Sequence, residues 1–356
     1  MTDKEKDFMK FIHIADVHLG AKPDQEKPWG KERENHSWQA FADVITKAGE
    51  EQVQLLLIAG DLFHRHPLLR ELKEVNYQFS RIPRTQVVMI AGEHEYLNDH
   101  SYFGAFPWGE NVHFLKEEKV DYVELEGLCT RVYGLSYHHR NIYENLCENI
   151  TLKEDGYCNI FLAHGGDEEH LPFQVKELER MNFDYVALGH IHKPMQMSGH
   201  KAVMAGALQP TECRDMGEHG YFMGEVEKGA CSVAFCPIRY CEYVSMNLKV
   251  SEEITTEALQ GVIEEQIKKA PSHQLFRLVL TGTGSSERII DTKALEQMER
   301  VVQVLDRCRP DYDFLQLKQR YEEQIPGRYI EALEKLPQDE ITRKALYYGV
   351  EALLAE

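Results

Sequence analysis

The chain has 356 residues, which is more than one ordinary domain needs and enough for two. Hydrophobic residues make up 43% and charged residues 28%, a balance that is typical of globular proteins and excludes extensive disorder. The formal net charge of -19 is spread along the chain without a basic half, which counts against tight, unaided binding to nucleic acid. Divalent metal ions remain compatible with this charge, because they offset carboxylates locally.

No stretch of the sequence approaches the ~18 apolar residues of a membrane-spanning helix, and residues 1–11 lack the apolar run of a secretory signal. We therefore expect a cytoplasmic protein without membrane contact. No internal repeat or low-complexity segment interrupts the chain, so the remaining pattern is typical of ordinary folded domains.

Five short apolar runs, each ending in polar residues or glycine, predict buried strands. These runs span residues 11–16, 53–61, 86–94, 158–166 and 183–192. Apolar positions recur at three- and four-residue intervals over residues 36–52 and 68–82, which predicts two helices between the first three strands. Strands that alternate with helices indicate an α/β fold, in which helices cover a sheet.

From about residue 200 to 249 the sequence becomes strand-rich with glycine-containing turns, which we interpret as a sheet that closes the first domain. Beyond it, the sequence predicts a helix over 251–269 and a strand over 273–283. Further helices are expected around residues 291–308, 314–323, 327–335 and 338–355. We therefore place a boundary near residue 245, with a large domain over 1–245 and a small α+β capping domain over 246–356.

Each of the five predicted strands is followed by residue types that bind metal ions. These residues are Asp16, His18, Asp61, Glu93, His94, His164, His190 and His192. Asp16 and His18 stand two apart, so their side chains would point to the same side if the strand continued. Ligands of α/β proteins bind beyond the carboxyl ends of strands, so five such ends can converge on one point. Mixed imidazole and carboxylate ligands suit manganese, iron or zinc better than magnesium or calcium alone.

The motifs that carry these residues resemble those of a known family. In chain order they read DVH (16–18), GDLFH (60–64), GEH (92–94), AHG (163–165) and GHIH (189–192). Five motifs in this order resemble the calcineurin-like metallophosphoesterases over residues 11–245. GDLFH together with GHIHKP and a separate C-terminal cap is similar to the SbcD-type DNA-repair exonucleases within that superfamily. The resemblance implies a catalytic β-sandwich flanked by helices, with the α+β cap beside it.

The resemblance also implies two divalent metal ions. The expected ligands are Asp16, His18 and His192 for one ion, His164 and His190 for the other, and Asp61 as a bridge between the two. The family carries an asparagine at the position of Glu93, where it completes the shell of the second ion. Glutamate adds a negative oxygen and has no N–H group to donate. We therefore expect reduced activity or a shifted metal preference.

Two cations ~3.5–4 Å apart lower the pKa of a bridging water, so that hydroxide can attack the phosphorus of a phosphodiester at neutral pH. By the resemblance, His94 protonates or stabilises the leaving oxygen, with Glu95 or Asp16 as the carboxylate that orients its imidazole. His64 is a candidate catalytic residue in contact with substrate, and a surface loop histidine is an equally good interpretation. The acidic segment 167–170, beside His164, is interpreted as a solvated loop, with support of the metal ligands as the less favoured alternative.

The leading prediction is a phosphodiesterase that acts on DNA, an exonuclease or endonuclease of the SbcD type. The resemblance implies manganese as the metal, with iron or zinc as alternatives, an SbcC-type coiled-coil ATPase as partner, and a homodimer. Two other functions stay open: the same chemistry on a small nucleotide, which the acidic charge favours, and a metal-binding scaffold whose activity Glu93 reduces. Turnover of a generic phosphodiester separates the enzymes from the scaffold, and a salt-dependent gel shift with DNA separates the two substrates.

Overall fold

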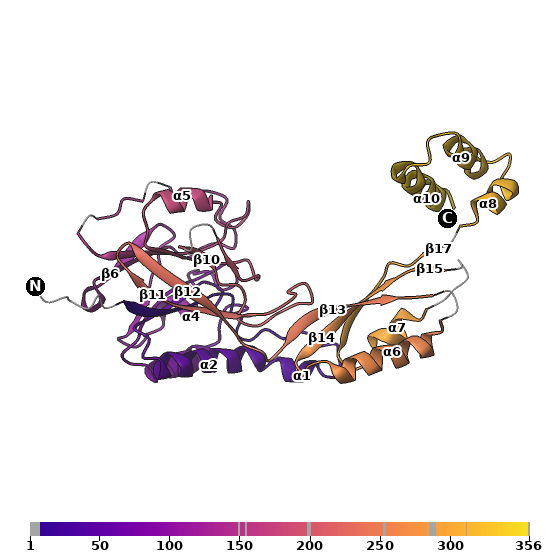
Figure 1. The fold of residues 1–356 in the computed structure, drawn as a ribbon. Coiled ribbons are helices and arrows are strands. Elements are labelled where there is room, and N and C mark those ends of the chain that lie inside the picture. The colour runs from indigo at the N-terminus through magenta and orange to yellow at the C-terminus, as the bar shows by residue number, and fades with distance from the viewer. Residues whose placement is uncertain are drawn as a thin grey trace, which may run out of the picture. The chain divides into compact units, whose positions relative to one another are not determined.

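The computed structural model describes residues 8–148, 150–153, 155–197, 201–251, 254–284, 290–310 and 312–354 (Figure 1). The chain divides into two compact units. The first comprises Met1–Ser245 with Ala270–Arg277, and the second comprises Met246–Lys269 with Leu278–Glu356. Among the described residues, no helix combines the length and the apolar character that crossing a bilayer requires.

The first unit contains a six-stranded sheet of order β12-β11-β1-β2-β3-β4. Strands β1 to β4 run parallel, and β11 and β12 extend the sheet as antiparallel strands. The strands are β1 (Met9–Ile14), β2 (Leu55–Ala59), β3 (Gln86–Ile90), β4 (Val112–Phe114), β11 (Gly220–Glu227) and β12 (Ala230–Pro237). The first three apolar runs of the sequence are therefore parallel neighbours.

A second six-stranded sheet in the same unit has the order β5-β6-β7-β8-β10-β9. Strands β6, β7, β8 and β10 run parallel, and the outer strands β5 and β9 are antiparallel. The strands are β5 (Asp121–Leu125), β6 (Thr130–Gly134), β7 (Cys158–His164), β8 (Tyr185–Gly189), β9 (Met195–Gln196) and β10 (Ala202–Met204). The last two apolar runs of the sequence thus belong to this second sheet.

The two sheets pack face to face because successive side chains of a strand point to opposite faces. Leu55 and Leu57 of β2 share an apolar core with Ile160 and Leu162 of β7. Leu56 points the other way, into a second core that the helices complete. Each fully buried side chain of this size contributes roughly 2 kcal/mol to folding. The expected α/β sandwich is confirmed.

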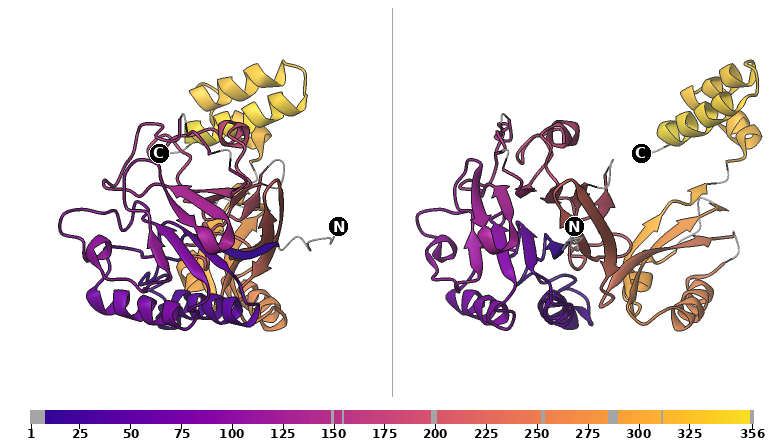
Figure 2. Two further views of the ribbon diagram at one scale, coloured as in Figure 1. Left: turned by 90° about the vertical axis from the view of Figure 1, so that its left-hand side faces the viewer. Right: turned by 60° about the vertical axis from the view of Figure 1, so that its left-hand side comes forward.

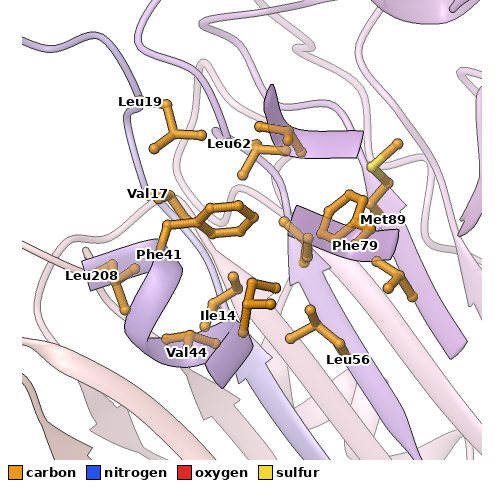
Figure 3. Close-up of a cluster of buried hydrophobic side chains, with 14 of the residues drawn as sticks. Ile14, Val17, Leu19, Phe41, Val44, Leu56, Leu62, Phe79, Met89 and Leu208 are labelled. Atoms are coloured by element: carbon orange, nitrogen blue, oxygen red, sulfur yellow. The ribbon is translucent and has the colours of Figure 1, made fainter. Parts of the chain in front are cut away.

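Helices α2 (His36–Glu50) and α3 (Leu69–Ser80) cover the outer face of the first sheet. Figure 3 shows Phe41 of α2 and Phe79 of α3 packed over the strand residues Leu56 and Met89. Helix α5 (Val175–Arg180) contributes Leu178 to the core on the outer face of the second sheet. The unit also contains α1 (Gly30–Arg33), α4 (Tyr102–Ala105) and a 3-10 turn, η1 (Glu126–Leu128).

The strands predicted between residues 200 and 249 do not form one sheet, which corrects the expectation from the sequence. Strand β10 joins the second sheet and β11 and β12 extend the first. Strand β13 (Glu242–Lys249) belongs to a three-stranded sheet of order β13-β14-β16. Alternating hydrophobicity identifies a strand but does not select its partner, because partners lie far apart along the chain.

The capping region contains the predicted helix as α6 (Thr256–Lys269) and the predicted strand as β14 (Gln274–Thr281). The prediction of helix over residues 291–308 is wrong for most of this stretch. Helix α7 (Thr292–Glu296) ends early, and β16 (Val301–Asp306) follows it. Three valines within the six residues of β16 favour a strand. Two short strands, β15 (Thr283–Gly284) and β17 (Arg309–Pro310), pair in parallel.

Three helices end the chain: α8 (Phe314–Arg320), α9 (Ile325–Glu334) and α10 (Glu340–Leu354). They pack on one another around Ile330, Leu346 and Val350, and both views of Figure 2 show them as a group. The three helices predicted for this stretch are therefore confirmed.

Candidate metal centre

The carboxyl ends of five parallel strands carry the candidate site. The strands are β1, β2 and β3 of the first sheet and β7 and β8 of the second. Side chains that follow them form groups in which the potential ligand atoms lie within 4.8 Å of one another. These groups are Asp16 with His18 and His192, Glu93 with His164 and His190, Asp16 with Asp61 and His164, and His18 with His64 and His94. The structure thus brings together every site residue expected from the sequence.

Four of these residues lie on strained backbone. Asp16, His18, Asp61 and His190 have positive φ angles of 47°, 48°, 50° and 97°. Strand β1 ends at Ile14, so the idea that a continuing strand aligns Asp16 with His18 is wrong. Backbone hydrogen bonds hold the loops instead: the Asp16 N–H donates to the Gly60 carbonyl (3.2 Å), and the His18 N–H donates to the Asp61 carbonyl (3.0 Å). Such strain costs ~1–3 kcal/mol per residue and is concentrated at functional sites.

Gly92 and Gly189 of the motifs have no room for a Cβ atom. A Cβ on Gly92 would overlap the carboxylate of Asp61, and a Cβ on Gly189 would overlap the carbonyl of Ala59. Side chains at these positions would therefore push the strand ends apart and displace Asp61 from the cluster.

His164, the last residue of β7, is fixed in one tautomer. Its Nδ1 donates a hydrogen bond to the Ala59 carbonyl at 2.7 Å, since a carbonyl can only accept. Its Nε2 lies 2.6 Å from Oε2 of Glu93 and 3.6 Å from Oδ2 of Asp61. Neither that Nε2 nor that Oε2 has an aligned hydrogen-bond partner. Burial opposes the charged form, but the Glu93 and Asp61 carboxylates raise the pKa of His164, so this position attracts positive charge.

The rings of His192 and His18 face each other through one nitrogen each. Nδ1 of His192 donates to Oδ2 of Asp215 at 3.0 Å, and Nε2 of His192 faces Nε2 of His18 at 3.0 Å. Burial lowers the pKa of His18 to about 3, which keeps its lone pair available. Burial also opposes charge on His192, but the Asp215 hydrogen bond and the Asp16 carboxylate raise its pKa to about 9. Two facing imidazole nitrogens need a proton or a cation between them.

His190 is held between two carboxylates. Its Nε2 donates to Oδ2 of Asp167 at 2.7 Å, and its Nδ1 faces Oε1 of Glu93 at 2.9 Å. Its backbone N–H donates to the carboxylate of Asp16 at 3.0 Å. The interpretation of residues 167–170 as a purely solvated loop is therefore wrong for Asp167. In a histidine that binds metal, a carboxylate on the second nitrogen fixes the tautomer and makes the ring more basic.

Asp215 was missed by the sequence analysis. It lies 23 positions after His192 in a segment without a metal-binding motif. Its Oδ2 also accepts hydrogen bonds from the N–H and hydroxyl groups of Thr211 at 2.9 and 3.0 Å. Burial raises the pKa of the carboxyl group, but the His192 hydrogen bond outweighs this and lowers it, so Asp215 is a fixed anion behind His192.

His94 and His64 lie beside the cluster. Nδ1 of His94 donates to the His64 carbonyl at 2.9 Å, and the two rings stack with centroids 5.1 Å apart. The His94 N–H donates to Oδ1 of Asp61 at 3.1 Å. A carbonyl, not Glu95 or Asp16, therefore orients the His94 imidazole, which corrects the expectation from the sequence.

Glu95 has a different position from the one expected. Its carboxylate is fully buried and accepts hydrogen bonds from the backbone N–H groups of Leu62, Phe63 and Gly92 at 3.1–3.3 Å. It thereby ties the loop that carries Asp61 to the loop that carries Glu93. Burial, with the nearby Asp61 charge, raises the pKa of Glu95 well above its ordinary value.

Two mixed sheets are packed as a sandwich, and imidazoles and carboxylates that could hold metal ions gather at the ends of their parallel strands, as a metallophosphoesterase requires. The chain belongs to the calcineurin-like phosphoesterase family, whose model matches residues 9–194. The chain is therefore a phosphoester hydrolase by family, and the resemblance to the calcineurin-like metallophosphoesterases is confirmed.

Three curated relatives extend the comparison. The chain is 30% identical over 298 residues to the uncharacterized metallophosphoesterase YhaO of Bacillus subtilis, covering 77% of this chain and 72% of that protein. It is 24% identical to the DNA double-strand break repair protein Mre11 of Methanopyrus kandleri, covering 81% and 68%. It is 27% identical to the Mre11 of Methanocaldococcus jannaschii, covering 52% of each chain.

Proposed function

We propose that this phosphoester hydrolase is a phosphodiesterase that depends on two divalent metal ions and cleaves DNA, as an exonuclease or endonuclease of the SbcD type. One observation carries the metal dependence. His164, His190 and His192 each donate a hydrogen bond from one ring nitrogen to an oxygen that can only accept. In the neutral ring, the other nitrogen of each histidine carries the lone pair with which it can bind a metal ion.

The geometry supports two ions rather than one. Asp16, His18 and His192 form one group of ligand atoms, and Glu93, His164 and His190 form another. Oδ2 of Asp61 lies 3.9 Å from Nε2 of His18 and 3.6 Å from Nε2 of His164, between the groups. Nitrogen and carboxylate oxygen together suit manganese, iron or zinc, and manganese is our first choice.

When bound, two such ions supply a water with a lowered pKa and polarise the phosphoryl oxygens. The residues of the chain provide the rest of the chemistry. His94, in its imidazolium form, donates a proton from Nε2 to the leaving oxygen, because its Nδ1 is engaged by the His64 carbonyl. The stacked His64 ring limits the orientation of His94 and faces the substrate. Asp167 and Asp215 hold the two histidines of the GHIH motif in the ligating tautomer.

DNA as substrate is supported by the Mre11 relatives, which are named for DNA double-strand break repair. The acidic charge counts against unaided DNA binding, so a partner fits this proposal. We propose an SbcC-type coiled-coil ATPase, which binds the C-terminal helices through exposed apolar side chains such as Leu315 and Ile341, 65% and 78% exposed. Replacing both by serine should abolish co-elution with that ATPase without changing hydrolysis of a small phosphodiester. We also propose a homodimer, which sedimentation at several concentrations tests.

The deciding experiment is hydrolysis of labelled single- and double-stranded DNA and of bis-p-nitrophenyl phosphate in Mn²⁺, with metal content measured on the same samples. The variants are Asp61→Ala and, as matched control, Asp43→Ala, an exposed carboxylate on α2. We expect two ions per chain and cleavage of both substrates, lost in Asp61→Ala only. Turnover of the small ester without DNA cleavage would support a small-nucleotide phosphodiesterase, and bound metal without any turnover would support a scaffold.

A further inference from the structure

A cavity of about 290 Å³ opens beside the candidate metal centre, within the first unit. The residues that line it are His64, Arg65, His66, Glu93, His94, Tyr96 and Arg140. This volume lies just below the roughly 300–1,000 Å³ of small-molecule sites, which suits a ligand no larger than a single nucleotide unit.

Of its two arginines, only Arg140 has a guanidinium group that is available for a ligand. Arg65 is engaged by Glu71, because both of its terminal guanidinium nitrogens donate hydrogen bonds to that carboxylate, at 2.7 and 3.0 Å. Arg140 is exposed and has no hydrogen bond or ion pair with any residue that the structure describes. In a chain with a net charge of -19, a guanidinium group without a protein partner on the wall of this cavity is available to attract an anionic ligand.

The loop that carries Arg140 is anchored on both sides. The side chain of His138 contacts the Lys116 carbonyl at 2.7 Å, and that of His139 contacts Glu118 at 3.1 Å. On the other side, the Ile142 N–H donates to the Glu169 carbonyl at 3.0 Å. The neighbouring side chains are thus turned towards other loops, and Arg140 reaches the cavity from a fixed backbone. A fixed position lowers the entropy cost of binding a ligand.

We infer that this cavity binds the leaving nucleotide of the substrate, and that Arg140 contacts the phosphate which that nucleotide carries at its far end. The direction follows from His94, which lines the cavity and, under the proposed function on which this inference rests, protonates the leaving oxygen. The group attached to that oxygen then enters the cavity. A guanidinium group binds a phosphate through paired charge-assisted hydrogen bonds, so Arg140 selects substrates whose leaving group bears a second phosphate.

Binding of nucleotides to the Mn²⁺-loaded chain tests this without any turnover. Thymidine 3′,5′-bisphosphate presents one phosphate to the metal centre and one to Arg140, whichever of its ends enters first. Thymidine 3′- and 5′-monophosphate lack the second phosphate. We expect the parent chain to bind the bisphosphate about tenfold more tightly than either monophosphate, as measured by calorimetry. Arg140→Gln should remove this advantage and leave the affinity for the monophosphates unchanged.

Arg84→Gln is the matched control, because Arg84 is also exposed but precedes β3, at the end of the sheet away from the site. It should keep the advantage of the bisphosphate. An advantage that persists in Arg140→Gln, or one that is absent from the parent chain, overturns the assignment.

Hydrolysis separates this inference from the proposed function. Arg140→Gln should reduce kcat/KM for DNA about tenfold and leave bis-p-nitrophenyl phosphate unaffected, because its leaving group carries no phosphate. A parent chain that hydrolyses neither substrate would contradict the proposed function, whereas the calorimetric result would still decide what Arg140 binds.

Discussion

Oε2 of Glu93 lies 2.6 Å from Nε2 of His164, and neither atom has an aligned hydrogen-bond partner. Oε1 of the same carboxylate faces Nδ1 of His190 at 2.9 Å. Burial would raise the pKa of Glu93, but the two histidines hold it well below its ordinary value, so the carboxylate is ionised. Glu93 therefore adds a full negative charge where the motif resemblance implies a neutral amide, and a phosphate substrate must approach that charge.

Glu93→Asn should weaken binding of the second metal ion and raise the rate of phosphodiester hydrolysis at saturating Mn²⁺, each by about tenfold. The reason is that the change removes a charge that attracts the ion and repels the phosphate. Metal titration and the rate on bis-p-nitrophenyl phosphate measure the two effects. Glu93→Gln is the control, since it removes the charge and keeps the length of the side chain. If neither variant differs from the parent in rate, Glu93 does not limit activity.

Asp167→Asn should weaken binding of the metal ion at His190 by about tenfold, because the histidine loses the carboxylate that fixes its tautomer. Binding of Mn²⁺ followed by calorimetry gives the affinity of each ion. Glu168→Gln changes the same charge at the adjacent exposed position and should leave both affinities as they are. Equal effects of the two variants would mean that Asp167 acts only through its charge.

The strand cores and the residues at their ends could be predicted from the sequence, because both are local. Leu55 to Ala59 form an uninterrupted apolar run, and Asp61 follows it after one glycine. Family motifs then located the same residues by an independent route. The backbone conformation at Asp16 and His18 could not be predicted from the sequence, because their positive φ angles depend on hydrogen bonds to the loop after β2.

Contacts between distant loops account for what the sequence analysis missed. Asp215 reaches His192, and Asp167 reaches His190, across 23 positions each, and no motif marks either carboxylate. The orientation of His94 depends on a backbone carbonyl, which any residue at position 64 would supply. The sequence does not identify strand partners for the same reason. Strand β13 has the same alternating pattern as β11 and β12 but pairs in a different sheet.

His94→Gln should lower kcat for DNA by roughly 10²–10⁴ and leave the metal content at the parent's value, since the proposed role of His94 is proton transfer and not metal binding. Rapid-quench kinetics measures the rate, and elemental analysis of the same samples measures the metal content. The effect should be smaller on bis-p-nitrophenyl phosphate, whose leaving phenolate needs little protonation. His100→Gln, at an exposed loop position, is the control. Metal loss in His94→Gln would assign this residue to the ligands instead.

His13 should make the fold sensitive to mild acid. It is fully buried in β1, contacts the Tyr185 hydroxyl at 2.9 Å, and burial lowers its pKa to about 3. The unfolded chain protonates His13 near pH 6.5, and the folded chain does not until about pH 3. Between these values the unfolded state binds more protons, so the stabilisation present above pH 6.5 is lost as the pH falls.

The free energy of unfolding should therefore decrease with falling pH, with His13 contributing up to ~1.4 kcal/mol per pH unit between about pH 6 and 4. Urea unfolding at several pH values in this range measures the slope. His13→Gln should reduce the slope by that amount whatever its effect on stability at pH 7, whereas His139→Gln, at an exposed position, should not. Because both variants keep the remaining titrating groups, the difference between their slopes isolates the one proton that the folded core excludes at His13.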